Sequence, residues 1–126
     1  MDAGSFSLVG VWRLRKAVRD DRRLALAATL ASHSDTHVSL DRLAAEIDQI
    51  HLRRRQATCA GVMRLDQIQG DLRVEELLRA ERQRLALRAE YLAAELRQRQ
   101  DQMAQAESDW RAIDWLRQRR TCAASD

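Results

Sequence analysis

Few residues of this chain have the type and spacing that could support chemistry, and the clearest are two histidines. His33 and His37 stand four positions apart, so on a helix both imidazoles lie on one face, with Asp41 one turn further along. That spacing suits a transition-metal ion, but a closed zinc site normally has four ligands. Neither the glutamate of an HExxH motif nor a nearby cysteine completes the set. We therefore interpret the histidines as polar positions that fix the register of a helix–helix contact.

Catalytic chemistry is not indicated elsewhere in the sequence. There is no glycine-rich phosphate loop, no nucleophile elbow and no carboxylate pair in a plausible pocket. Cys59 and Cys122 are too few for a disulfide scaffold, and we expect both thiols to be reduced. The sequence thus predicts a protein that is not an enzyme, with no catalytic residue, no metal and no cofactor.

The composition indicates long helices. Of 126 residues, 45% are hydrophobic and 33% charged, proline is absent, and only four glycines occur. An aromatic content of 4% is too low for an ordinary compact globule but is sufficient for a thin seam between helices. No uncharged apolar run approaches the roughly 20 residues that cross a bilayer, and the N-terminus does not have the charge order of a signal peptide. We expect a soluble, cytoplasmic protein.

A seam with a heptad-like period of 3.5 residues organises both halves of the chain. In the second half, spacings of four and three select Leu85, Ala89, Leu92, Leu96, Arg99, Met103, Ala106, Trp110, Ile113 and Arg117. In the first half, a less regular stripe selects Leu8, Val11, Leu14, Val18, Leu26, Leu30, His33, His37, Leu40, Leu43, Ile47 and Ile50. Each half therefore predicts one long helix.

Helix boundaries are signalled between the halves. Gly61 follows a run of three arginines, a favourable sequence for a helix C-terminus, and Gly70 precedes Asp71, a good N-cap. We predict a single coiled-coil domain over residues 1–126, with helix 1 at about 8–57, a turn at about 58–71 and helix 2 at about 72–120. Helices of nearly equal length predict an all-α fold, an antiparallel coiled-coil hairpin of two long helices.

This hairpin brings together two basic, tryptophan-containing ends. The stretch from Trp12 to Arg23 carries six positive and two negative charges, and the stretch from Arg111 to Arg120 carries four and one. Trp110 lies on the predicted seam, whereas Trp115 lies about 140° around the helix from it and is a plausible contact anchor. Clustered cations attract phosphate as well as acidic protein surfaces, but we do not expect nucleic acid to be the partner.

The two ends of the sequence also resemble a known family. Phe6, Leu8, Val11, Leu14 and Arg15, within FSLVGVWRLR, resemble the opening of the flagellar export protein FliJ family, and AESDWRAIDWLRQRR is similar to that family's closing stretch. The resemblance implies a central stalk of the flagellar type III protein export apparatus. Such a stalk enters the hexameric export ATPase with its terminal end, reaches the cytoplasmic domain of the export gate with its turn, and meets export chaperones. It would associate only peripherally with the membrane complex, at the cytoplasmic face of the inner membrane.

Two sets of partner-binding residues follow from the resemblance together with the charge pattern. The ATPase-facing set consists of Arg13, Arg15, Arg19, Trp115, Arg117, Arg119 and Arg120. The gate-facing set consists of Leu52, Arg53, Met63, Leu65 and Leu72. Two alternatives stay open: a virulence-type secretion stalk of the same architecture, and a coiled-coil adaptor or weak nucleic-acid-binding protein.

Overall fold

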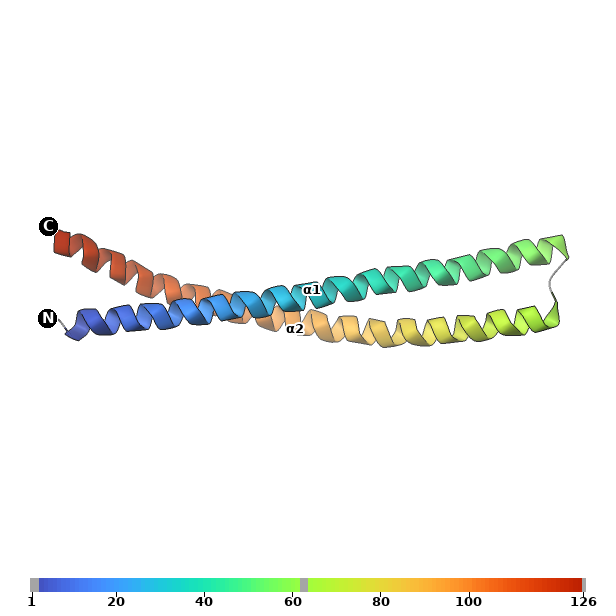
Figure 1. Ribbon diagram of the computed structural model, residues 1–126, viewed down its shortest axis with the longest axis horizontal. Helices are drawn as coiled ribbons and strands as arrows, with labels where there is room; N and C mark the ends of the chain where they lie inside the picture. The colour runs from blue at the N-terminus through green and yellow to red at the C-terminus, as the bar shows by residue number, and fades with distance from the viewer. Residues whose placement is uncertain (1–2, 62–63, 126) are drawn as a thin grey trace. The chain divides into compact units, whose positions relative to one another are not determined.

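The chain folds into two long helices. The computed structural model describes residues 3–61 and 64–125, and side chains within 7–61 and 64–123. Helix α1 spans Ala3–Ala60 and helix α2 spans Leu65–Ser125 (Figure 1). The two helices pack against each other, and the described residues contain no strand. The predicted all-α hairpin is therefore confirmed.

The connection between the helices is shorter than the sequence suggested. Helix α1 ends at a left-handed glycine, because Gly61 has a φ of 68° and its N–H donates to the Thr58 carbonyl at 3.2 Å. Helix α2 begins at Leu65, and the Gln67 side chain accepts a 3.3 Å hydrogen bond from the Arg64 N–H, as in a capping box. The expected start after Gly70 is not observed, because that glycine lies within α2.

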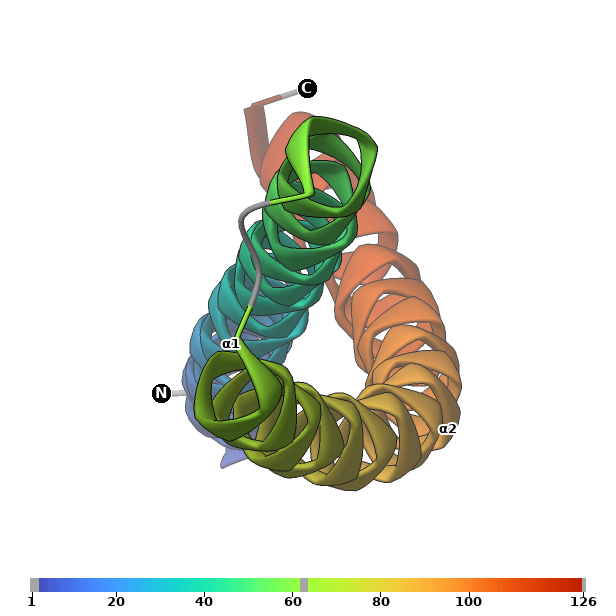
Figure 2. The ribbon, with the colours of Figure 1, turned by 90° about the vertical axis from the view of Figure 1, so that its right-hand side faces the viewer.

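The chain divides into two compact units, and each unit contains one segment of α1 and one segment of α2. The open-end unit comprises Met1–Ala31 and Ala94–Asp126, and the turn-end unit comprises Ser32–Ala93. In the open-end unit Trp12 contacts Asp114 and Arg22 contacts Gln102, so partner numbers fall as α1 numbers rise. This order shows that the helices are antiparallel. In the turn-end unit the last turns of α1 and the first turns of α2 lie side by side (Figures 1 and 2).

The α2 contact face follows the predicted stripe closely. All ten positions named for the second helix are buried or half-buried, and Leu92 and Ala106 are only 3% and 5% exposed. The regular spacing of leucine and alanine in this half identifies the face without ambiguity. The predicted seam of the second helix is confirmed.

The α1 contact face differs from its predicted stripe at several positions. Thr29 and Thr36 are buried, whereas the expected seam residues Leu14 and Leu30 are 61% and 46% exposed. Each threonine hydroxyl donates to the carbonyl four residues earlier, at 3.0 Å and 2.8 Å, so burial leaves it satisfied. The seam keeps its seven-residue spacing through small polar residues, and the neighbouring leucines face outward.

The histidine pair lies only partly on the contact face. His33 is half-buried but His37 is exposed, so the expectation that both imidazoles occupy the seam is wrong for His37. Their Nε2 atoms lie 3.3 Å apart and their rings meet edge to face at a centroid distance of 4.5 Å. Thr36 occupies the buried position next to His37, which explains the outward placement.

Candidate functional site

A polar cluster around Trp12 fixes the register of the open-end unit. Trp12 Nε1 donates a 2.9 Å hydrogen bond to Asp114 Oδ1, which joins α1 to α2. The Arg117 guanidinium lies 4.5 Å from the centre of the Trp12 ring and also donates to Asp114, at 3.5 Å. Gln118 completes the group with a 3.1 Å hydrogen bond to Asp114 Oδ2. The carboxylate thus collects donors from both helices and holds the tryptophan against α2.

A second aromatic contact lies toward the interior of the same unit. The Arg19 guanidinium is stacked on the Trp110 ring at 4.0 Å and is paired with Asp20 at 3.1 Å. Arg19 is only 9% exposed, so its aliphatic stem and guanidinium are part of the helix–helix contact. The Trp110 Nε1 atom is buried without a hydrogen-bond partner in the described part of the chain. This ring is held by packing and by the cation above it.

Beyond these contacts the helix ends diverge and leave a groove. Toward the termini, α1 and α2 move apart (Figure 1), and a groove of about 570 Å³ lies between them. Its walls are apolar and its rim is basic, and it is formed by Leu8, Val11, Ile113, Leu116, Arg119 and Arg120. Leu8 and Ile113 belong to the seam, but no opposing residue covers them fully, since both are only half-buried. The divergence therefore converts the last turns of the seam into an open apolar surface.

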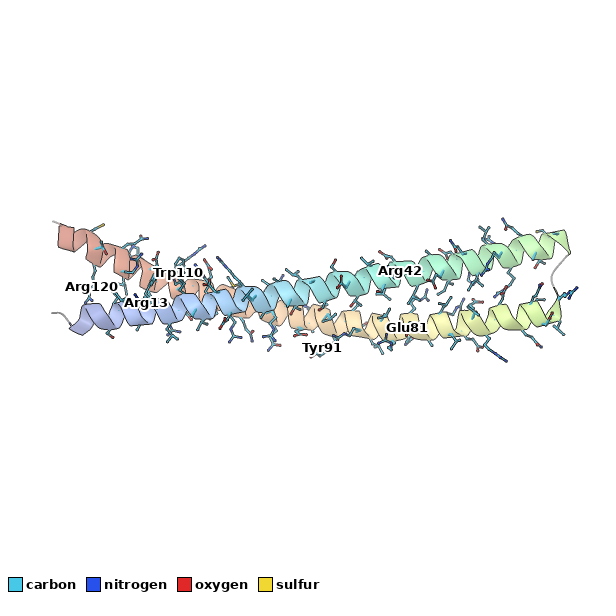
Figure 3. All side chains as sticks on the ribbon, viewed as in Figure 1. Arg13, Arg42, Glu81, Tyr91, Trp110 and Arg120 are labelled. Carbon is cyan, nitrogen blue, oxygen red and sulfur yellow. The ribbon has the colours of Figure 1, made fainter. Side chains whose placement is uncertain are left out.

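The predicted ATPase-facing residues all lie in the open-end unit but have different environments. Arg19 and Arg117 are used inside the hairpin, and Arg15 forms a 3.8 Å ion pair with Asp109 across it. Arg15 is nevertheless exposed, as are Arg13, Trp115, Arg119 and Arg120. Figure 3 labels Arg13 on α1 and Arg120 on α2 near the ends of the helices.

The last two arginines of α2, Arg119 and Arg120, differ from Arg111 and Arg117 in having no acidic partner among the described residues. Arg111 pairs with Glu107 at 3.2 Å and Arg117 with Asp114 at 3.5 Å, whereas Arg119 and Arg120 form no ion pair with any residue the structure describes. Arg119 instead lies 5.2 Å from the centre of the Trp115 ring, which is 56% exposed. The groove is therefore bordered by two guanidinium groups that have no acidic partner among the described residues, and it lies near an accessible tryptophan.

Four of the five predicted gate-facing residues lie in the described part of the turn-end unit. Leu52, Leu65 and Leu72 are 48%, 71% and 45% exposed, and Arg53 is also exposed. Met63 lies outside the described residues. The remaining members of the set are accessible but are distributed over the ends of both helices.

A buried carboxylate cluster in the turn-end unit was not predicted as a site. Glu75 is 7% exposed and accepts hydrogen bonds from His51 Nε2 at 2.6 Å and Arg54 at 2.7 Å. It also forms an ion pair with Arg79 at 2.7 Å. The His51 hydrogen bond, followed by that of Arg54, lowers the pKa of Glu75 to about 2. The sequence signal was present in Glu75 itself, which lies on the seven-residue series of the α2 seam. Its partners on α1 could be identified only once the register was known.

The arrangement of the described side chains suits binding by surface contact. Within residues 7–61 and 64–123, no group of three or more histidine, cysteine or acidic side chains has the geometry of a metal site. No helix in the described part of the chain is long and apolar enough to cross a membrane. The open-end groove, with its apolar walls and basic rim, is the most developed candidate site.

Comparison with known proteins adds no relative to these observations. No protein-family model matches the chain, and no curated protein or solved structure matches it.

Proposed function

We propose that this chain is a non-enzymatic coupling protein of a flagellar type III export apparatus, with its open end docked in a hexameric export ATPase. The observation that carries the proposal is the open-end groove, whose Arg119 and Arg120 have no acidic partner in the part of the chain that the structure describes. An apolar surface bordered by free cations is a typical protein-binding surface, since apolar contact supplies affinity and charge orients the partner. The FliJ-like sequence at both helix ends lies in this same unit, and this supports the assignment of the ATPase as partner.

The turn-end unit supports a second contact. Leu52, Leu65 and Leu72 expose apolar side chains toward the ends of both helices in this unit, where a partner could cover them. In the proposed function these residues meet the cytoplasmic domain of the export gate, and export chaperones bind along the hairpin. The protein then acts at the cytoplasmic face of the inner membrane, without entering it.

The coupling mechanism follows from symmetry. One hairpin cannot contact six identical ATPase subunits in the same way, so each subunit meets a different part of its surface. A contact that is stronger in one conformation of a subunit shifts that subunit toward it. The hairpin would thereby bias the subunits one at a time, without catalytic residues of its own.

Stimulation of the export ATPase from the same cell by the purified chain tests the proposal. We expect the wild-type chain to raise the rate of ATP hydrolysis and the double variant Arg119→Glu/Arg120→Glu to return it to the basal level. Arg117 is left unchanged, because its replacement would also disturb the contact with Trp12. The matched control is Arg73→Glu/Arg97→Glu, which reverses two exposed arginines of α2 elsewhere.

The controls separate the possible outcomes. Both variants should keep the helicity of the wild-type chain, measured by circular dichroism, since no ion pair of the described residues is lost in either. Full stimulation by the Arg119→Glu/Arg120→Glu variant would contradict the assignment of the open-end groove as the ATPase-binding surface. Absence of stimulation by the wild-type chain, together with failure to capture the ATPase from a cell extract, would contradict the proposed function itself.

A further inference from the structure

The open-end groove has the form of an incomplete helix packing site. On α1, Leu8 and Val11 are three positions apart, and on α2, Ile113 and Leu116 have the same spacing. Residues at this spacing lie one turn apart on the same face of a helix. The groove therefore presents two short apolar rows, one from each helix, which is the surface that a third amphipathic helix covers with its own i, i+3 and i+4 side chains.

The charge at the rim specifies the chemistry of that third helix. Arg119 and Arg120 both line the groove and have no carboxylate partner among the described residues, although most arginines along the open-end seam are paired. A guanidinium forms its strongest contacts with carboxylates, often through two parallel hydrogen bonds. A basic helix would meet repulsion at this rim, and a neutral one would leave both guanidinium groups without a carboxylate.

We propose that the groove binds an acidic amphipathic helix of a partner protein. Its apolar face lies between the rows of α1 and α2, and its glutamate or aspartate side chains pair with Arg119 and Arg120. The inference rests on the proposed function in that it names the part of the partner that the open end recognises. It differs from that function in requiring a specific contact, made by Leu116 and its neighbours, which can be tested without the ATPase.

A direct binding experiment uses designed peptides as probes. The first is a labelled peptide of about 18 residues, or five helical turns, with leucines on one face and glutamates beside them. The second has the same composition in scrambled order, and the third has lysine in place of each glutamate. Binding to the full chain is measured by fluorescence anisotropy, and methyl NMR signals of Leu8, Val11, Ile113 and Leu116 locate the contact.

We expect only the first peptide to bind tightly and to shift these methyl signals. Leu116→Gln should weaken binding of the first peptide by about tenfold or more. Burying a leucine side chain in the core of an interface typically changes the dissociation constant by at least about this factor. Leu116 is 42% exposed, so the substitution leaves the fold intact. The control Leu87→Gln alters a leucine of α2 that is 60% exposed and lies outside the groove, and it should bind the peptide like the wild-type chain.

Several results would overturn the inference. Equal binding of the scrambled peptide would show that the apolar face is not recognised. Equal binding of the lysine peptide would show that the carboxylates are not recognised. Binding of dodecanoate in place of the acidic peptide would identify a small amphiphile as the ligand. Concentration-dependent dimerisation that is lost in Leu116→Gln would identify a second copy of the chain as the occupant.

The same variant separates this inference from the proposed function. If Leu116→Gln stimulates the export ATPase as well as the wild-type chain does, the groove inference fails while the function stands. If the acidic peptide binds in the groove but the wild-type chain neither captures nor stimulates the ATPase, the groove stands and the proposed function fails.

Discussion

The hydrogen bond from Trp12 to Asp114 should stabilise the open-end unit measurably, and a double-mutant cycle can isolate its contribution. Trp12→Phe removes the indole N–H but keeps an aromatic ring beneath Arg117, and Asp114→Ala removes the acceptor. A hydrogen bond to a charged group contributes about 1.5–3 kcal/mol when well shielded. The Asp114 side chain retains 18% exposure, so water screens it in part. We therefore expect a coupling free energy of about 1–2 kcal/mol between the two substitutions.

The cycle is measured by urea unfolding of the four chains, followed by far-ultraviolet circular dichroism. Trp115→Phe is the matched control, because it makes the same chemical change at an exposed tryptophan of α2, and it should change stability by less than about 0.5 kcal/mol. A coupling free energy below about 0.5 kcal/mol, the range in which independent sites add, would refute the view that this contact fixes the register.

Two further predictions concern the turn-end unit. Gly61→Ala should destabilise the hairpin by about 1–2 kcal/mol, because its φ of 68° is unfavourable for a residue with a side chain, whereas Gly70→Ala within α2 should stabilise it by about 0.5–1 kcal/mol. A Cβ atom at either glycine meets no atom within 4 Å, so the two substitutions differ only in their effect on the backbone. Thermal unfolding measures both variants, and a change of the midpoint temperature in the same direction for both would contradict the assigned end of α1. Glu75 has its pKa lowered from 4.5 to about 2, so it stabilises the fold above about pH 4.5, and this stabilisation is lost as the pH falls toward 2. The stability difference between the wild-type chain and Glu75→Gln, measured by urea unfolding across this range, should shrink on acidification; a constant difference would show that the carboxylate is not held ionised.

Sequence patterns predicted the elements and their pairing better than the details of the contact face. The α2 seam was identified because the spacings of four and three continue there without a break and eight of the ten positions are apolar. The α1 seam was misassigned at Leu30 because hydrophobicity favours a leucine over Thr29, whereas the hairpin satisfies the threonine hydroxyl with a backbone carbonyl. Similarly, Gly70 suggested a helix boundary, but one exposed glycine costs a long helix little.

The features of the candidate site that were not predicted depend on which residues of α1 lie opposite which residues of α2. The Glu75 cluster requires α1 residues more than twenty positions earlier in the chain, and no local pattern pairs them. The groove depends on the divergence of the helix ends, which leaves the seam residues Leu8 and Ile113 only half-buried, whereas heptad spacing alone would predict that the seam stays closed to its end. The functional assignments of Arg119, Arg120 and Trp115 remain predictions for the experiments above.

The two polar clusters join residues at very different distances along the chain, and this difference affects the order in which the hairpin folds. Glu75 and His51 are 24 residues apart, but Trp12 and Asp114 are 102 apart. The second loop is about two doublings longer, and closing it directly would cost about 1.2 kcal/mol more in chain entropy. We expect folding to start near the turn and to proceed like a zipper, so that the Trp12 contact forms late and opens first. Amide hydrogen exchange should then be faster around Trp12 and Ile113 than around Glu75, and the reverse order would exclude this route.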